Sequence, residues 1–157
     1  MKIMVLAVGR GMPPAVRTLV NDYQQRLERI GGVSLLEIAE ARRTGDSVAE
    51  RQQGLLWEAT RLRERLPPAA LLLPLESGGR SMPSPAFAAE MQSWRDAHAT
   101  VCFLIGGPDG LHPDILRLGA WSLSLGPMTF PHMLVRVLLL EQLYRAYTIL
   151  QRIPYHR

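Results

Sequence analysis

The sequence predicts an α/β fold in which a mostly parallel sheet is covered by helices on both faces. Short apolar runs of strand length alternate along the chain with segments whose apolar residues recur at helical spacing. The run at residues 69–75 is continuous rather than alternating, which is typical of a parallel strand buried on both faces. No internal repeat, low-complexity tract or linker interrupts the pattern, so we expect one domain over residues 1–157.

The boundaries of the elements follow from capping and helix-breaking residues. Pro13 and Pro14 are expected to open the first helix and Gly31-Gly32 to end it, because proline fits the first helical turn and glycine fits a helix end. The second begins at Asp46 or Ser47, where Glu50 completes a capping box. Later helices are expected from Ser84-Pro85 onward with Phe87, Met91 and Trp94 on one face, near residues 113–118, and from about residue 132 to 147. The apolar runs predict five strands, at residues 2–9, 33–39, 69–75, 100–105 and 121–125.

The stretch at residues 124–147 stands out. It begins as a Gly-Pro turn and continues into a helix that is apolar almost all round, apart from a narrow polar stripe around Glu141. Such a helix is buried or packed against a partner chain. Arg136 points away from the polar stripe, and His132 lies one turn earlier on the same face. Because an unpaired buried charge is costly, Arg136 must be paired or must meet a ligand.

The composition describes a chain that can fill a core: 157 residues, 47% apolar, with a net charge of +4 and a pI near 9.8. No apolar run reaches the roughly 18 residues needed to span a bilayer, and nothing indicates secretion, so we expect a cytoplasmic protein with no membrane partner. The single cysteine, Cys102, is expected in the core. The basic balance permits an anionic partner such as nucleic acid, but Lys2 is the only lysine, and a genome that prefers arginine would give the same charge.

Three loops are candidate ligand sites. Residues 76–80, 106–110 and 126–131 each follow an apolar strand and are rich in glycine or proline. Ligands of parallel α/β sheets bind outside the carboxyl ends of the strands, and glycine lets the backbone approach a ligand closely. Each loop taken singly also fits an ordinary turn; three at one sheet edge favour a site.

The familiar signatures of other functions are absent from the sequence. There is no dinucleotide-binding or phosphate-loop fingerprint, no nucleophile elbow and no Cys/His cluster with zinc spacing, so no metal is expected. Arg42 and Arg43 lie in a polar loop at residues 41–47, and they fit either a solvated loop or a phosphate contact. The terminal Tyr155, His156 and Arg157 fit either a frayed end or a stacking ring with cationic donors for an unstacked base.

Four stretches give the chain a specific likeness: MKIMVLAVGRGMP at the start, LIGGPDGL at 104–111, WSLSLGPMTFPHMLVRVLLLEQLYRAY at 121–147 and PYHR at the end. They resemble the ribosomal RNA large subunit methyltransferase H family. Its members are small SPOUT-class enzymes that use S-adenosylmethionine to methylate N3 of a pseudouridine in large-subunit (23S) ribosomal RNA. The likeness covers essentially the whole chain, and residues 40–68 carry little of it.

The resemblance implies a C-terminal trefoil knot, a homodimer, and S-adenosylmethionine held in the loops of the knot. Periodicity says nothing about threading, and the usual rule runs against knotted chains. Carried over to this sequence, the cofactor-binding positions fall in the three loops, at Leu75, Glu76, Gly106, Gly107, Gly126, Pro127, Met128, Thr129, Phe130 and Pro131.

The terminal residues are the expected catalytic group. N3 of the target is an imide N–H and needs a base or a group that stabilises its anion. His156 titrates near neutrality and is the candidate base, Arg157 could stabilise the anion or fix a phosphate, and Tyr155 would stack. The partner subunit could supply all three. Arg136 and His132 are expected to support the cofactor loop or the dimer interface.

Two rival functions use the same residues differently. A non-catalytic RNA-binding module of the same fold would need the basic surface but leaves the glycine loops unexplained. A small-molecule enzyme with another nucleotide cofactor should carry one of the absent fingerprints. Binding of S-adenosylmethionine separates the module from the methyltransferase.

Overall fold

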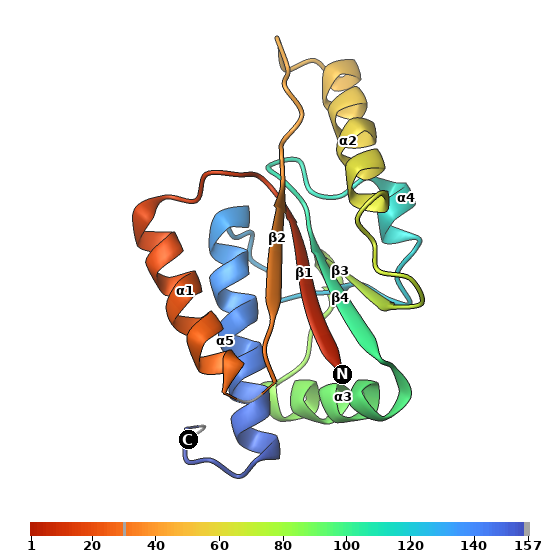
Figure 1. Ribbon diagram of the computed structural model, residues 1–157. Helices are drawn as coiled ribbons and strands as arrows, with labels where there is room; N and C mark the ends of the chain where they lie inside the picture. The colour runs from red at the N-terminus through yellow and green to blue at the C-terminus, as the bar shows by residue number, and fades with distance from the viewer. Residues whose placement is uncertain (30, 156–157) are drawn as a thin grey trace.

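A parallel sheet forms the centre of the molecule. The structure is a computed structural model that describes residues 1–29 and 31–155. Over these residues β1 (Lys2–Val8), β2 (Ser34–Ile38), β3 (Leu71–Arg80) and β4 (Thr100–Ile105) form a four-stranded sheet in the order β2-β1-β4-β3 (Figure 1). All three strand pairs are parallel. The carboxyl ends of the strands therefore meet at one edge, as the sequence predicts.

Helices cover both faces of this sheet. The described residues form α1 (Pro14–Glu28), α2 (Val48–Arg63), α3 (Ser84–Ala97), α4 (Pro113–Leu116) and α5 (His132–Leu150). In Figure 1, α1, α3 and α5 lie on one side of the sheet, and α2 and α4 lie on the other. The α/β class and the two covered faces are thus confirmed.

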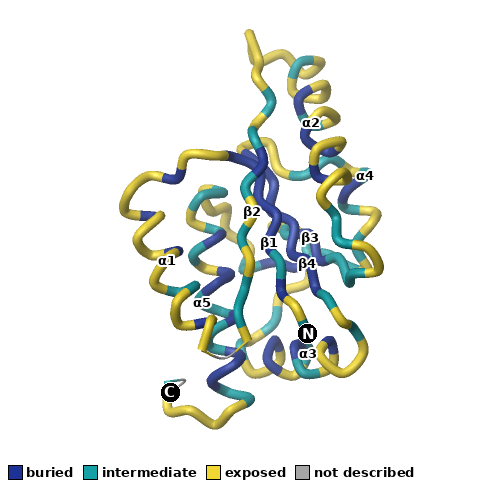
Figure 2. Tube along the Cα trace, viewed as in Figure 1, coloured by how far each residue is buried: buried dark blue, intermediate teal, exposed yellow. Residues whose placement is uncertain are grey.

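Alternate residues of the central strands enter two separate cores. Val5 and Phe103 pack with α1, α3 and α5, whereas Leu6 and Leu104 pack with α2 and α4. Side chains of successive strand residues point to opposite faces, so a continuous apolar run is what a strand buried on both faces needs. Figure 2 shows the resulting band of buried residues along β1 and β4. Cys102 lies within this band and is fully buried, as predicted.

Local capping fixes the helix starts. Pro14 is the first residue of α1, and the capping box of α2 is complete: the Ser47 hydroxyl accepts the Glu50 N–H, and the Glu50 carboxylate accepts the Ser47 N–H. Both predicted starts are confirmed. The apolar residue that opens α2, Val48, is 68% exposed.

Two expectations at the edge of the sheet are wrong. Residues 76–80 are not a tight turn, because β3 continues through them to Arg80. Residues 121–125 are not a fifth strand, and Leu123 makes only isolated bridges, to Leu75 and Arg80. The Arg80 N–H donates to the Ser122 carbonyl (2.7 Å) and the Ser124 N–H donates to the Arg80 carbonyl (3.0 Å), so the later segment serves as a short backbone partner for the end of β3. Whether the chain is knotted here stays a prediction.

Helix α5 runs three residues beyond its expected end and packs against α1 and α3. Its polar stripe is present, with Glu141 accepting from Arg145 Nε at 2.9 Å. No helix among the described residues has the length and apolar character needed to cross a membrane.

Candidate functional site

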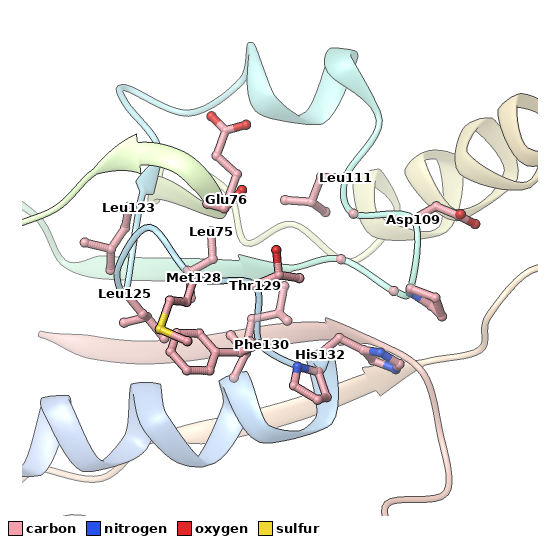
Figure 3. Close-up of a pocket in the computed structure, with 18 of the residues that line it drawn as sticks. Leu75, Glu76, Asp109, Leu111, Leu123, Leu125, Met128, Thr129, Phe130 and His132 are labelled. Atoms are coloured by element: carbon pink, nitrogen blue, oxygen red, sulfur yellow. The ribbon is translucent and has the colours of Figure 1, made fainter.

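A cavity of about 690 Å³ lies at the carboxyl ends of the strands. Its walls come from the end of β3, the loop after β4 and the loop before α5 (Figure 3). These are the three stretches singled out in the sequence, although the first of them is strand rather than loop. Nine of the ten predicted cofactor positions line it: Leu75, Glu76, Gly106, Gly107, Gly126, Met128, Thr129, Phe130 and Pro131. Pro127 is not among the lining residues. The structure therefore brings together segments that are more than 50 residues apart in the chain.

The loop at residues 106–110 is folded back on itself. The Gly110 N–H donates to the Gly107 carbonyl (3.0 Å), and these two residues form an isolated antiparallel bridge. A Cβ added to Gly106 would lie 2.2 Å from the carbonyl carbon and oxygen of Gly110, so no side chain fits there without moving the backbone. Backbone groups rather than side chains thus form this wall of the cavity.

The loop at residues 126–131 is tied to the end of β3 through one hydroxyl. Ser124 Oγ accepts the Gly126 N–H at 3.1 Å and lies 3.0 Å from the Ser77 carbonyl oxygen. Ser124 is itself buried. Two of the three loops are thus held to each other by a buried polar residue, which fixes the width of the cavity between them.

The lining combines an apolar surface with a few polar groups. Ile105 and Leu123 are buried, and Leu125, Val135 and Leu75 add further apolar surface. The polar members are Glu76, Asp109, Thr129 and His132, and Figure 3 shows them spread around the wall. An apolar pocket with a small number of polar groups is typical of a site for a small organic ligand.

Arg136 and His132 anchor the helix that follows the loop. Arg136 is fully buried; its guanidinium is paired with Glu37 of β2, and Nη2 donates to the carbonyls of Val8 (2.6 Å) and Gly9 (2.9 Å). Burial lowers the pKa of Arg136, and the charge of Glu37 opposes that shift. His132 Nε2 lies 3.1 Å from Glu40 Oε1. Arg136 is therefore paired, as expected, and it ties the start of α5 to the ends of β1 and β2.

Tyr155 is the one member of the predicted catalytic group that the structure describes, and it does not line the cavity of its own chain. Tyr155 packs beyond the last turns of α5, edge-on to Tyr144 with ring centroids 4.8 Å apart, and the Arg145 guanidinium lies 4.9 Å from its ring centroid. Burial raises the pKa of Tyr155 to about 12. At about 1.5 Å per residue, Tyr144 lies roughly 18 Å along the helix axis from His132 at the cavity. His156 and Arg157 lie outside the described residues.

Sequence reasoning missed several wall residues and one ion pair. Ile105 is the last residue of its strand, a position that could have indicated it. Arg43, interpreted as solvated or as a phosphate contact, instead pairs with Asp109 of the cavity wall, with Nη1 to Oδ2 at 2.8 Å. No spacing in the sequence predicts that contact. Among residues 1–29 and 31–155 there is no group of three or more metal-ligating side chains.

The sequence and the fold match one class of proteins. A family model described as "Predicted SPOUT methyltransferase" matches residues 1–156. A solved structure, a probable methylase family protein from Haemophilus influenzae Rd KW20, superposes with a TM-score of 0.54 at 11% identity, over 99% of this chain and 70% of that one. This second likeness supports the fold alone.

Closer relatives define the family within that class. Proteins named ribosomal RNA large subunit methyltransferase H are 46% identical in Magnetococcus marinus and 45% identical in Cereibacter sphaeroides. The alignments cover 99% of both chains in the first case, and 100% of this chain and 99% of the relative in the second. The chain therefore belongs to the ribosomal RNA large subunit methyltransferase H family of SPOUT methyltransferases.

Proposed function

We propose that this protein is an S-adenosylmethionine-dependent methyltransferase that modifies N3 of a pseudouridine in 23S ribosomal RNA and works as a homodimer. The observation that carries the proposal is the cavity where the end of β3 meets the loops at residues 106–110 and 126–131, in a chain whose relatives are named ribosomal RNA methyltransferases. The net charge of +4 per chain doubles in a dimer and favours an RNA partner.

The cavity suits the cofactor in size and in chemistry. Its volume of about 690 Å³ lies within the usual range for small-molecule pockets. The close contact at Gly106 leaves no room for a side chain at that position, so backbone groups there can face an adenine edge. Glu76 is exposed at the rim, where its carboxylate can accept hydrogen bonds from ribose hydroxyls or from an amino group.

When bound, S-adenosylmethionine supplies a methyl group already activated by its sulfonium. The task of the protein is to hold the acceptor nitrogen in line at near-attack distance, which contributes much of the rate. The loop at residues 126–131 would provide that positioning, because it lines the cavity and is held at its far end by the pairing of Arg136. His156 would take the N3 proton, and Arg157 would stabilise the resulting anion.

We place the terminal residues in the site of the partner subunit. Tyr155 is packed against the far half of α5, away from the cavity of its own chain. An apolar face also runs from the cofactor loop onto α5. Its members Met128, Phe130, Leu134 and Leu138 are all exposed, and the last two are one helical turn apart. Pairing two such faces about a two-fold axis would cover them and carry each tail to the other chain.

Calorimetry with S-adenosylmethionine tests the cofactor assignment. We expect binding in the micromolar range, followed by methylation of large-subunit ribosomal RNA from a strain that lacks the enzyme, with the product mapped to N3 of one pseudouridine. Absence of binding would favour a non-catalytic RNA-binding module of the same fold. Methylation of a different base would overturn the assigned target but not the cofactor.

Mixing two inactive variants tests the shared site. One variant carries Gly106→Val in the cofactor loop, and the other lacks residues 155–157. With the tail acting on the partner, each mixed dimer regains one working site, so an equimolar mixture should recover about a quarter of wild-type turnover. A tail that serves its own chain gives no recovery. A truncated protein with near-wild-type turnover would refute the catalytic assignment altogether.

A further inference from the structure

The segment at residues 41–43 lies between α2 and the glycine loop of the cavity. Gly54, in the middle of α2, is where the segment approaches the helix. A Cβ at that position would lie 3.3 Å from Ala41 Cβ and 3.3 Å from Arg43 Cδ. Glycine is unfavourable inside a helix, and here it makes room for the stem of Arg43. The segment is therefore seated on α2 through close contact.

A buried carboxylate fastens the start of the same segment. Glu58, one turn further along α2, is buried, and its Oε1 accepts the Ala41 N–H at 2.9 Å. Its other oxygen lies 3.7 Å from where a Cβ on Gly107 would stand. Glu58 thus binds the segment directly and lies close to the glycine loop.

Arg43 links the segment at residues 41–43 to the glycine loop at residues 106–110. Its guanidinium contacts the carboxylate of Asp109 at 2.8 Å, and both side chains are about three-quarters buried, with 25% and 29% exposed. Figure 3 shows Asp109 at the side of the cavity that faces α2. Asp46 also pairs with Arg43, but it is farther away, at 3.8 Å, and 80% exposed. Asp109 is therefore the principal partner of Arg43.

We propose that Arg43 is a positioning residue for the cofactor site and acts through Asp109. The inference rests on the proposed location of the cofactor in this cavity. The hydrogen bond from Gly110 to Gly107 closes the loop at residues 106–110 on itself but does not tie it to α2. The Arg43–Asp109 pair restrains it from outside and keeps the Asp109 carboxylate turned toward α2 rather than free in the cavity. Arg43 itself need not touch the cofactor.

The test measures the Kd for S-adenosylmethionine, by calorimetry without RNA, in Arg43→Met, Asp109→Asn and the double variant. Methionine keeps most of the apolar stem that packs on Gly54 and removes the charge. Each single variant should bind about fivefold more weakly, and the double variant no more weakly than either, because the two side chains act as one pair. Arg43→Lys should recover part of the loss, since a lysine can still reach a carboxylate.

Arg51→Met is the matched control. Arg51 also lies beside this segment, with Nε 3.4 Å from the Asp46 carboxylate, but it does not contact the glycine loop. The Arg51→Met variant should bind S-adenosylmethionine with the Kd of the wild type. Hydrogen exchange of the amides at 106–110, without cofactor, should accelerate in Arg43→Met and not in Arg51→Met.

Three outcomes would overturn the inference: an unchanged Kd in Arg43→Met, a double variant in which the two losses multiply, or a loss confined to the KM for RNA. The last would make Arg43 a phosphate contact instead. A wild-type protein that binds no S-adenosylmethionine would overturn the proposed function itself, so the two failures are distinguishable.

Discussion

Replacing Arg136 with methionine tests whether one buried guanidinium holds the cofactor loop in place. The side chain is fully buried and serves Glu37 and the carbonyls of Val8 and Gly9. Removing one partner of a buried ion pair destabilises a protein by about 3–5 kcal/mol. The side chain of Glu37 is 21% exposed and regains some hydration, so we expect a loss near the lower limit, about 3 kcal/mol. That is a large share of the about 5–15 kcal/mol by which a domain is stable.

Equilibrium unfolding in urea measures the loss. Arg136→Met should lower the midpoint, and the same variant under native conditions should bind S-adenosylmethionine more weakly or dimerise less, because α5 follows directly from the cofactor loop. Adding Glu37→Gln should restore part of the stability, since it removes the stranded charge while leaving the two carbonyls unpaired. Arg61→Met, which breaks an exposed ion pair with Glu64, is the control and should change little.

The reasoning fails if the free energy of unfolding of Arg136→Met lies within about 1 kcal/mol of the wild-type value, because breaking a buried ion pair should cost more than that. It also fails if Glu37→Gln worsens the Arg136→Met variant. Either result would mean that water or another side chain replaces the guanidinium.

Three further predictions concern the loop and the two cores. Gly106→Ala should weaken cofactor binding at least about tenfold, because the new methyl group overlaps Gly110, and an unchanged Kd in calorimetry would contradict this. Burial raises the pKa of the Glu58 carboxyl above its ordinary value of 4.5. The folded protein therefore binds the carboxyl proton more tightly than the unfolded chain does, and the contribution of Glu58 to stability falls as pH rises above about 4.5. The stability of Glu58→Gln relative to the wild type should therefore be higher at pH 7.5 than at pH 4, as measured by urea midpoints. A difference between variant and wild type that is the same at both pH values would refute the prediction. Burial raises the pKa of the Cys102 thiol to about 12, so a disulfide reagent at pH 8 should modify it only after unfolding, and fast native labelling would disagree.

The sequence was sufficient to predict where the cavity lies but not which residues hold its walls together. Continuous apolar runs fixed β1 and β4, and parallel strands bring the loops that follow them to one edge, so the convergence of three loops was predictable. That Arg136 must be paired followed from its position on an apolar face. The identity of its partner did not, because Glu37 is 99 positions earlier in the chain and nothing local connects the two.

The wrong expectations have a common cause. Glycines at 78 and 79 indicate a turn when the chain has no partner there, but a partner is supplied by residues 122–124, far along the sequence. Contacts of this kind depend on tertiary structure, which local patterns do not encode. The Arg43–Asp109 pair is a second example, since both residues lie in loops with no periodicity to read.

The two ends of α5 have different tasks, and their separation bears on the assembly. Its first turn continues the cofactor loop and is pinned by Arg136 to the strand ends. Its last turns hold Tyr155 through Tyr144 and Arg145. Tyr155 lies beside Tyr144, roughly 18 Å along the helix axis from His132, which supports our proposal that the tail acts at the cavity of the partner subunit. A two-fold pairing of the exposed apolar face beside the loop would bring the tail of each chain toward the cavity of the other. The dimer would then be a requirement of catalysis, and dilution to monomers should abolish methyl transfer at saturating cofactor.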